Sequence, residues 1–308
     1  MELATEHLER YRAIIPEWEA FLESLQHPLP TVLWTNTLRI TPEELVAILR
    51  EEGIAVTPLP WYPGAFRVQS EHPSPGTTWA YFAGLFHIQE EVSLLPPYLL
   101  QPQPNERILD LCAAPGNKTA QIAVMMENTG TVVANDHNRH RVGAIRAVVD
   151  RLGLINVSIL VSDGTSFSPR NGTFDRVLVD VPCSCEGTSR KTPTVLAQCS
   201  LHFSERLAKR QLLLLKRAVE VCRPGGIIAY STCTYAPEEN EMVVDQVLQL
   251  FPDQLEILPI TIPNFTFSPG LTAWQGHELN RNLRHTLRVY PHQNDTGGFY
   301  VALLRKRQ

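Results

Sequence analysis

The segment 107-RILDLCAAPGNKTAQIAVMM-126 predicts a buried strand, a loop of small residues and a helix, in that order. A short apolar run bounded by turn residues favours a strand, and the longer run after the loop has the length of a helix. The same alternation continues toward the C-terminus. Strands are expected at 131–136, 157–163, 174–182 and 227–234, and helices at 138–153, 205–222 and 237–251. The pattern predicts an α/β fold with a doubly wound, mostly parallel sheet covered by helices on both faces.

A closing hairpin is expected after these units. Residues 287–306, LRVYPHQNDTGGFYVALLRK, predict two strands joined across a Gly-Gly turn. An antiparallel pair is a common edge for a sheet that is otherwise parallel. We therefore expect residues 106–308 to form one catalytic domain.

The first 105 residues have a different organisation. Residues 1–76 predict a small α+β subdomain, with an amphipathic leading helix over about the first 27 residues and strands on either side of a second helix. The second helix has clear boundaries, because Thr41 and Glu44 form a capping-box pair and Gly53 ends it. Residues 77–105 are expected to be a connecting helical segment, and the Pro- and Ser-rich stretch 70–78 predicts a linker or exposed loop.

Charge is spread unevenly over the chain. Residues 1–100 carry 5 Lys and Arg against 13 Asp and Glu, a net charge of −8, and residues 101–308 carry 22 against 19, a net charge of +3. Of the 27 basic residues 22 are arginines, the type suited to phosphate contacts and base stacking. This permits an RNA partner without establishing one. No run of eighteen apolar residues and no signal peptide are recognisable, so we expect a cytoplasmic protein outside the membrane.

Candidate binding residues stand at the predicted strand ends. In doubly wound sheets, ligands bind beyond the carboxyl ends of the strands, where the strand order switches. Small loop residues let a ligand approach the backbone, and aspartates at the ends of the strands can accept its hydrogen bonds, although each can alternatively cap the helix that follows. The candidate cofactor-binding residues are Cys112, Ala113, Ala114, Pro115, Gly116, Asn117, Lys118, Asp136, Asp163 and Asp180.

Two cysteines also stand at strand ends. Cys183 follows the strand at 174–182, and Cys233 ends the strand at 227–234. Cysteine suits nucleophilic catalysis, because a positive or dipolar neighbour raises its thiolate fraction. Either thiol could in principle attack a substrate. No C-x-x-C pair occurs, so no metal is expected, and the remaining cysteines at 185, 199 and 222 are interpreted as packing residues.

Five segments resemble the S-adenosylmethionine-dependent RNA cytosine-5 methyltransferases of the NOP/Sun family. They are LDLCAAPGNKT (109–119), AND (134–136), SDGT (162–165), DVPCSCEGTSRK (180–191) and YSTCTYAPEENE (230–241). The N-terminal subdomain and the closing strand are also similar to this family, in which the bacterial ribosomal-RNA branch is the nearest likeness. The resemblance implies a Rossmann-like class I methyltransferase sheet, with Asp136 on the ribose and Asp163 on the adenine edge of S-adenosylmethionine.

The resemblance also implies a division of labour between the two thiols. Cys233 would be the nucleophile that adds to C6 of the cytosine, and Cys183 would help the covalent adduct to break down. Asp180 would protonate the ring or hydrogen-bond to it at N3. Arg190 and Lys191 are candidates for phosphate contacts, with solvated loop charges as the alternative.

The partner implied is RNA, most simply ribosomal RNA, with transfer RNA as the alternative. A methyltransferase acting on DNA or protein would leave the second cysteine without a purpose. A catalytically silent RNA-binding assembly factor would be expected to lose the cysteines or the aspartates, and both sets are present. The target nucleotide and the oligomeric state stay open.

Overall fold

The computed structural model describes residues 6–69 and 73–307, so part of the predicted linker at 70–78 lies outside the described residues. Its main element is a mixed sheet whose parallel strands run in the predicted doubly wound order. In spatial order these strands are β7 (Val157–Val161), β6 (Thr131–Asp136), β5 (Arg107–Asp110), β8 (Phe174–Asp180) and β9 (Cys222–Thr232). The chain moves outward from β5 to β7 and then returns to β8 on the other side of β5. The switch point of the strand order therefore lies between β5 and β8.

Antiparallel strands extend the sheet beyond β9, as predicted. They are β15 (Phe299–Lys306), β14 (Leu287–Val289) and β11 (Ser268–Pro269), and β10 (Leu255–Ile257) pairs with β15. The connection from β14 to β15 is more than the expected Gly-Gly turn. A short helix, α9 (Pro291–Asn294), precedes the two glycines. Pro291 explains the helix, because its fixed φ is favourable in the first helical turn.

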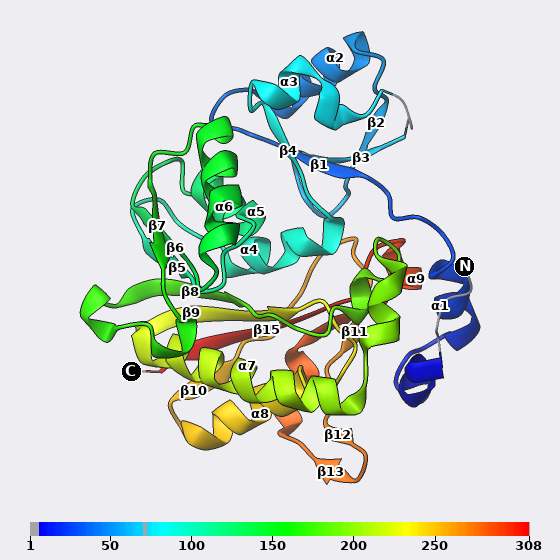
Figure 1. Cartoon of the computed structure of the whole chain (residues 1–308), viewed down its shortest axis with the longest axis vertical. Helices are drawn as coiled ribbons and strands as arrows, with labels where there is room; N and C mark the ends of the chain where they lie inside the picture. The colour runs from blue at the N-terminus through cyan, green and yellow to red at the C-terminus, as the bar shows by residue number, and fades with distance from the viewer. Residues whose placement is uncertain (1–5, 70–72, 308) are drawn as a thin grey trace.

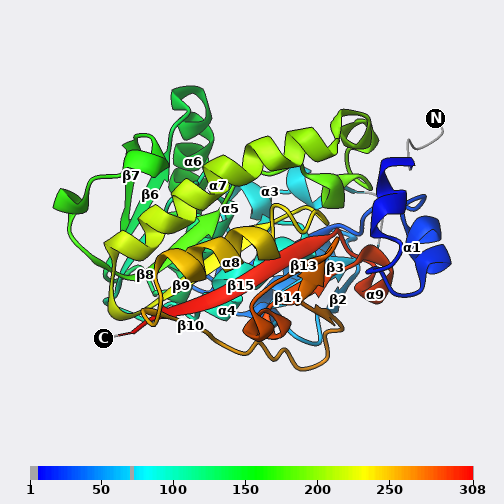
Figure 2. The ribbon, with the colours of Figure 1, turned by 90° about the horizontal axis from the view of Figure 1, so that it is seen from below.

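Helices cover both faces of the sheet. Figure 2 shows α7 (Leu201–Val221) and α8 (Glu241–Leu250) side by side along one face. The other face carries α4 (Leu95–Leu100), α5 (Asn117–Met125) and α6 (Arg139–Leu152). Neighbouring residues of one strand point to opposite faces, so Ile108 enters the core with α6 and Leu109 enters the core with α7. Burial on both faces explains why the inner strands β5, β6 and β8 are short continuous apolar runs, whereas β7 at the edge is partly exposed.

A second, four-stranded sheet stands above the first in Figure 1, with the order β2-β3-β1-β4. Its strands are β1 (Val32–Thr35), β2 (Val56–Pro58), β3 (Ala65–Val68) and β4 (Phe86–Ile88). The predicted capping box is present on α2 (Pro42–Glu51), where Thr41 Oγ1 accepts a bond from the Glu44 backbone N–H and Glu44 Oε2 accepts one from the Thr41 N–H.

The segment 77–105 is not wholly helical. It contains α3 (Trp79–Phe82) and α4, but β4 lies between them and pairs antiparallel with β1. Three residues carry too little alternation to be recognised as a strand from sequence. The other short elements are 3-10 helices at Glu6–Tyr11, Pro75–Thr77, Glu91–Leu94, Gly164–Ser166, Pro169–Asn171, Glu186–Thr188, Pro193–Gln198 and Arg281–His285, and the strand pair β12 (Ala273–Trp274) and β13 (His277–Glu278).

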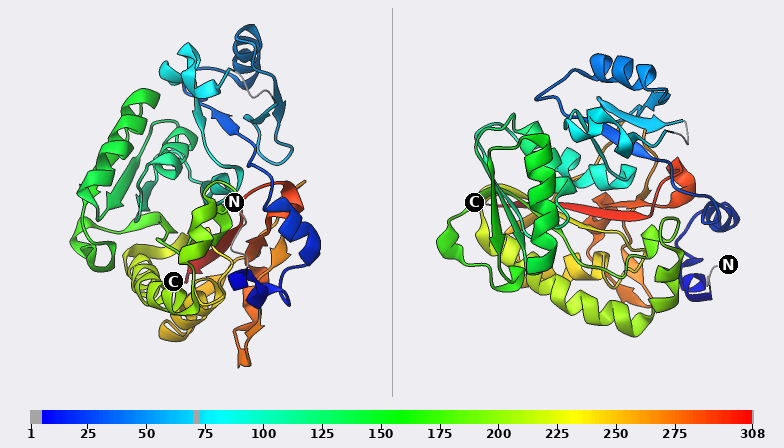
Figure 3. Two further views of the ribbon diagram at one scale, coloured as in Figure 1. Left: turned by 45° about the vertical axis from the view of Figure 1, so that its right-hand side comes forward. Right: turned by 45° about the horizontal axis from the view of Figure 1, so that its top comes forward.

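The leading segment forms two short helices and not the single helix that was expected. A 3-10 helix covers Glu6–Tyr11, and α1 covers Trp18–Ser24. Between them Pro16 lacks a backbone donor, and Glu17 has a left-handed backbone with φ 51°, so the helix cannot run through. The segment packs beside α9, and the ribbons of α1 and α9 can be followed side by side in Figure 3. It buries Tyr11 and Phe21 against Tyr235. It therefore supports the large sheet.

The predicted division of the chain at residues 76 and 105 stays a prediction. Within residues 6–69 and 73–307, no helix combines the length and the apolar composition that crossing a bilayer needs.

Candidate active site

A cavity of about 550 Å³ lies at the carboxyl ends of β5, β6, β8 and β9, where the switch point placed it. Six of the seven predicted loop residues line it: Cys112, Ala113, Ala114, Pro115, Asn117 and Lys118. Gly116 has a different role. Its φ is 110°, and a Cβ there would lie 3.0 Å from Ile145 Cα, so glycine lets the loop turn and pack on α6.

Asp136, at the end of β6, lines the cavity and is 2% exposed. Its Oδ2 accepts a hydrogen bond from the Ala114 backbone N–H at 3.1 Å, and its Oδ1 accepts one from the Asn138 N–H at 2.9 Å. The carboxylate thus braces the small-residue loop. Each oxygen still has a lone pair free, because a carboxylate offers about four acceptor positions.

Asp163 follows the end of β7, and the structure favours its alternative role as a cap. Its side chain is half exposed, does not line the cavity, and accepts a bond from the Thr165 backbone N–H at 3.0 Å. That bond is the main reason why the pKa of Asp163 is lowered. Gly164, the next residue, does line the cavity.

Asp110, at the end of β5, is a further residue of the site, although its sequence context did not distinguish it from the loop residues that follow. It is 1% exposed and lines the cavity. Its Oδ2 accepts from Thr119 Oγ1 at 2.6 Å, while its Oδ1 has no hydrogen-bond partner among the described residues. Burial raises the pKa of this carboxyl to about 7. The residue thus lies in the wall of the cavity with one buried acceptor that the protein leaves unused.

The two predicted thiols meet. Because β8 and β9 are parallel neighbours with Asp180 opposite Ser231, the residues that follow each strand come side by side. The Sγ atoms of Cys183 and Cys233 lie 3.3 Å apart, and the Cys233 backbone N–H points at Cys183 Sγ, also at 3.3 Å. Both residues line the cavity.

A third thiol belongs to this cluster, and its interpretation as a packing residue is wrong. Cys185 lines the cavity with its Sγ 3.8 Å from Cys183 Sγ. Its backbone is left-handed, with φ 62°, which turns the side chain back toward Cys183. The C-x-C spacing of Cys183 and Cys185 was the feature of the sequence that could have indicated this. Cys222 is buried in the core as expected, and Cys199 Sγ donates to the Val195 carbonyl at 3.2 Å.

The three thiols titrate together because they share hydrogen bonds. Bonds from Cys183 and then Cys233 lower the pKa of Cys185 to about 3. Hydrogen bonding to Cys185 and Cys233, together with burial, raises the pKa of Cys183. For Cys233, the bond with Cys183 lowers the pKa, but the contact with Cys185 and burial outweigh it and raise the pKa. The three thiols therefore titrate as one cluster, in which the hydrogen bonds favour the thiolate at Cys185 over that at Cys183 or Cys233.

Lys118 pairs with the predicted acid of the site. Its Nζ lies 2.7 Å from Asp180 Oδ2, and Ser231 Oγ donates to Asp180 Oδ1 at 2.7 Å. Burial alone would lower the pKa of Lys118, but the charge of Asp180 and the hydrogen bond to it raise the pKa. The pair therefore places an ammonium donor and a carboxylate beside the thiols.

Two buried glutamates hold the cysteine loops in place. Glu186, next to Cys185, accepts bonds from Thr234 Oγ1 at 2.7 Å and from the Tyr235 backbone N–H at 3.1 Å. Glu239 accepts from the Ser184 backbone N–H at 3.0 Å and from Gln211 Nε2 at 2.8 Å, and burial raises its pKa to about 7. Neither residue was predicted.

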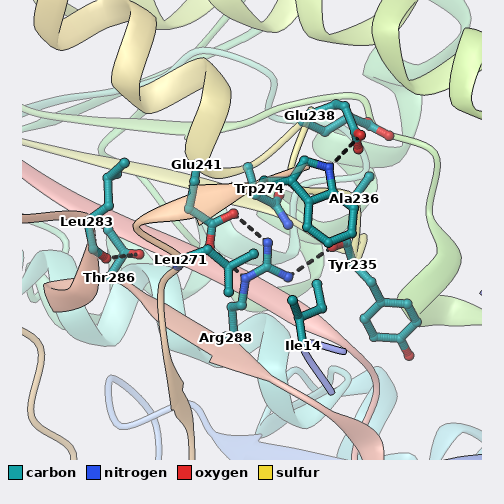
Figure 4. Close-up of polar contacts among 12 residues, drawn as sticks. Ile14, Tyr235, Ala236, Glu238, Glu241, Leu271, Trp274, Leu283, Thr286 and Arg288 are labelled. Carbon is teal, nitrogen blue, oxygen red and sulfur yellow. Dashed lines mark hydrogen bonds and ion pairs between the residues drawn. The ribbon is translucent and has the colours of Figure 1, made fainter. Parts of the chain in front are cut away.

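A buried ion pair supports the far side of the Cys233 loop. Figure 4 shows the Arg288 guanidinium between the Glu241 carboxylate and the Tyr235 carbonyl. Arg288 Nε donates to Glu241 Oε1 at 2.6 Å, and Nη1 donates to the Tyr235 carbonyl at 2.9 Å. In the same view Trp274 Nε1 donates to Glu238 at 2.9 Å. A buried pair with its donors used in this way fixes the backbone that follows Cys233.

Arg190 and Lys191 separate into different roles. The Arg190 side chain is 1% exposed and donates to the His27 carbonyl at 2.9 Å and the Thr296 carbonyl at 3.0 Å. It ties segments together and is not free for phosphate, so that candidate is wrong. Lys191 is exposed and lines the cavity.

The doubly wound sheet, the cavity at its switch point and the thiol pair define a class I methyltransferase fold with a cysteine-based site. A family model described as 16S rRNA methyltransferase RsmB/F matches residues 97–305, and one described as the N-terminal domain of 16S rRNA methyltransferase RsmF matches residues 3–91. The chain therefore belongs to the RsmB/F family of RNA cytosine-C5 methyltransferases.

Individual relatives agree with this assignment. The chain is 39% identical to a tRNA (cytosine(49)-C(5))-methyltransferase of Pyrococcus abyssi, over 97% of this chain and 95% of the relative. It is 36% identical to ribosomal RNA small subunit methyltransferase F of Erwinia tasmaniensis over 97% of this chain, but spans only 62% of that relative's length. A crystal structure of a methyltransferase homologue from Pyrococcus horikoshii superposes with a TM-score of 0.86 at 34% identity, covering 97% of this chain and 93% of that one.

Proposed function

We propose that this protein transfers a methyl group from S-adenosylmethionine to C5 of a specific cytidine in ribosomal RNA, through a covalent adduct between Cys233 and C6 of the base. The observation that carries the proposal is the 3.3 Å contact of the Cys183 and Cys233 sulfurs at the ends of adjacent strands. Transfer RNA is the second candidate, favoured by the Pyrococcus abyssi relative, which this chain matches over nearly its full length. A cytoplasmic location stays part of the proposal.

The residues of the cavity fit the proposed cofactor. A volume of about 550 Å³ is in the usual range for a pocket that holds a small molecule. The cofactor presents ribose hydroxyls and an ammonium group, all of them donors. Asp136 retains free acceptor positions, and Asp110, whose Oδ1 has no partner among the described residues, lines the same cavity. Ala113 and Ala114 leave room for the ligand to approach the loop backbone.

When bound, the cofactor supplies an electrophilic methyl group. Carbon 5 of cytosine is a poor nucleophile until a thiolate adds to C6. In the proposed reaction the proton of Cys233 passes to Asp180 and its Sγ bonds to C6. The pair of Lys118 and Asp180 supplies the proton or hydrogen bond that N3 needs as the ring becomes an enamine. C5 would then take the methyl group, and the C5 proton would pass to water in the open cavity.

The last step is release of the enzyme. Loss of the C5 proton returns electrons to the ring, and the bond between Cys233 Sγ and C6 breaks to restore aromaticity. Cys183 lies 3.3 Å from the departing sulfur, where it can assist the collapse of the adduct. The base must first leave its stack, so the substrate is an RNA loop, a bulge or a transiently open pair.

The test is direct. The purified chain would be incubated with radiolabelled S-adenosylmethionine and with ribosomal RNA or transfer RNA, and the product would be mapped by bisulfite sequencing. We expect one modified cytidine. Bisulfite sequencing of total RNA from cells with and without the gene would identify the natural target. Label found at an adenine, in protein, or in neither RNA would contradict the proposal.

A further inference from the structure

We propose that Cys183, Cys185 and Cys233 form a preorganised trithiolate site for a thiophilic cation such as Zn²⁺, whose binding blocks the nucleophile. The sulfur atoms of all three residues lie within 4.8 Å of one another, and all three residues line the cavity. The site differs from a structural zinc centre in that its three ligands line an open cavity.

The distances between the sulfurs agree with those of a zinc site. A Zn–S bond of about 2.3 Å places the sulfurs of a tetrahedral site about 3.8 Å apart, and those of a planar trithiolate about 4.0 Å apart. The Cys183 Sγ lies 3.8 Å from Cys185 Sγ and 3.3 Å from Cys233 Sγ. Shifts of a few tenths of an ångström in one side chain bring the cluster into coordination geometry. The fourth position would face the cavity and take water.

The backbone gives a second reason to regard the cluster as a built site. Cys185 occupies a left-handed conformation, φ 62°, that glycine or asparagine adopts at lower cost. That conformation brings its Sγ toward Cys183, and the thiol donates a hydrogen bond to the Cys183 carbonyl, with Sγ and O 3.2 Å apart. A residue held in a rare backbone region is often placed there for function.

The loops that carry the ligands are rigidly supported. Ser184, between the two cysteines of its loop, contacts Thr234 Oγ1 at 2.7 Å and gives its backbone N–H to Glu239. Glu186 then joins the end of the same loop to Thr234. Little conformational entropy remains to be lost when a cation binds, which favours affinity.

Binding would exchange protons for metal. The cation forms three bonds to sulfur, and the thiol protons that remain in the cluster pass to solvent, so affinity rises with pH. The lone pair of Cys233 Sγ that would form the bond to C6 is then used by the metal. The metal site rests on the sulfur geometry alone, whereas its effect on methylation rests on the proposed role of Cys233.

Calorimetry with Zn²⁺ and absorption spectroscopy with Co²⁺ would test the site on the intact chain. The protein would be kept reduced with a phosphine, because a dithiol competes for the metal. We expect one Zn²⁺ per chain, proton release, and an intense sulfur-to-cobalt charge-transfer band. Cys185→Ser should weaken Zn²⁺ binding more than tenfold, because serine is a poor zinc ligand of similar size. Cys199→Ser is the matched control and should bind as the unchanged chain does.

The outcomes separate the two parts of the proposal. Equal Zn²⁺ affinity in the unchanged chain and in folded Cys185→Ser would overturn the site, as would an equal loss in Cys199→Ser. In a methylation assay, Zn²⁺ should inhibit the unchanged chain, and a chelator should restore its activity. At the same Zn²⁺ concentrations Cys185→Ser should keep the rate that it has without metal. Tight zinc binding without inhibition would retain the site and overturn Cys233 as the nucleophile.

Discussion

Tyr11 and Glu186 are joined by a hydrogen bond of 2.9 Å, although 175 residues separate them along the chain. The same buried carboxylate accepts from His7 at 2.7 Å and from Thr234 at 2.7 Å. One side chain therefore connects the leading segment to both cysteine loops. Glu186 is a positioning residue in this arrangement, since it is hydrogen-bonded to the loops and lies behind them.

Glu186→Gln should weaken this connection, because an amide has one acceptor oxygen and adds two donors where four donors already converge. We expect the free energy of unfolding to fall by about 1–3 kcal/mol, the range for leaving buried polar groups unsatisfied. The turnover number should fall while the affinity for S-adenosylmethionine stays unchanged. Urea denaturation, steady-state kinetics and calorimetry would measure these quantities. Tyr11→Phe, which removes only one donor, should show a smaller loss, and an equal loss would refute the central role of Glu186.

The two thiols can be distinguished by their covalent products. Cys233→Ala should abolish methylation and form no covalent complex with RNA, because the atom that adds to C6 is missing. Cys183→Ala should still attack and transfer the methyl group, and then stall as an adduct that resists denaturant and requires S-adenosylmethionine. A denaturing gel of both variants with substrate RNA gives the answer. The mirror result, with the band in Cys233→Ala, would exchange the two roles.

Asp136→Ala should weaken the binding of S-adenosylmethionine by at least about 1 kcal/mol, the loss expected for a charge-assisted hydrogen bond. The substitution also removes the acceptor of the Ala114 backbone N–H, so the loop itself loses support. Calorimetry on the folded variant measures the change. Asp163→Ala is the matched comparison, since its carboxylate caps residue 165 outside the cavity, and we expect it to bind almost normally. A larger loss of affinity in Asp163→Ala than in Asp136→Ala would show that Asp163 binds the cofactor after all.

Glu239 should make stability depend on pH. Burial raises its folded-state pKa from 4.5 to about 7, so the folded protein binds the proton more tightly than the unfolded chain does. The stability contributed by this proton is present below pH 4.5 and is lost as the pH rises toward 7. Glu239→Gln should therefore lose less stability between pH 5 and 7.5 than the unchanged chain, by about 1–3 kcal/mol. Urea denaturation at the two pH values measures the difference, and parallel pH profiles would show that Glu239 is ionised throughout.

RNA binding should be weak and strongly dependent on salt, because the first hundred residues are acidic and the basic residues lie later in the chain. Lys191 lines the cavity and is exposed, so Lys191→Ala should reduce the slope of log affinity against log salt by about 1. Lys216, which lies outside the cavity lining on α7, is the matched control. Fluorescence anisotropy at several salt concentrations measures both. A slope near zero in the unchanged chain would be inconsistent with phosphate contacts.

The sequence predicted the large sheet well because its inner strands are buried on both faces, which makes them short apolar runs between clear helices. The positions of Cys183 and Cys233 followed from the same pattern, since residues after adjacent parallel strands must come together. The break at Pro16 and Glu17 was missed because the apolar spacing continues through it. β4 was missed because three residues carry no recognisable period.

Tertiary contacts explain the other differences. Arg190 has the sequence context of a phosphate ligand, but three carbonyl groups from distant segments take its donors, and no local pattern reveals them. Cys185 looked like a packing cysteine because its left-handed backbone, which turns the sulfur into the cavity, leaves no mark on residue type. Asp110 and Glu186 are isolated acidic residues in the sequence. Only their buried positions and their hydrogen bonds in the folded protein show that they belong to the site.

The position of the leading segment has a consequence for biosynthesis. Tyr11 and Ile14 leave the ribosome long before their partners, because Tyr11 docks on Glu186 and the Ile14 carbonyl accepts a bond from Tyr290, 276 residues later. During translation the leading segment has no contact partners until the parallel strands and the residues after them have been synthesised. The thiol loops thus acquire their full support only when residues 288–290 have emerged, so a translation product that stops before them would carry both cysteines without an assembled site.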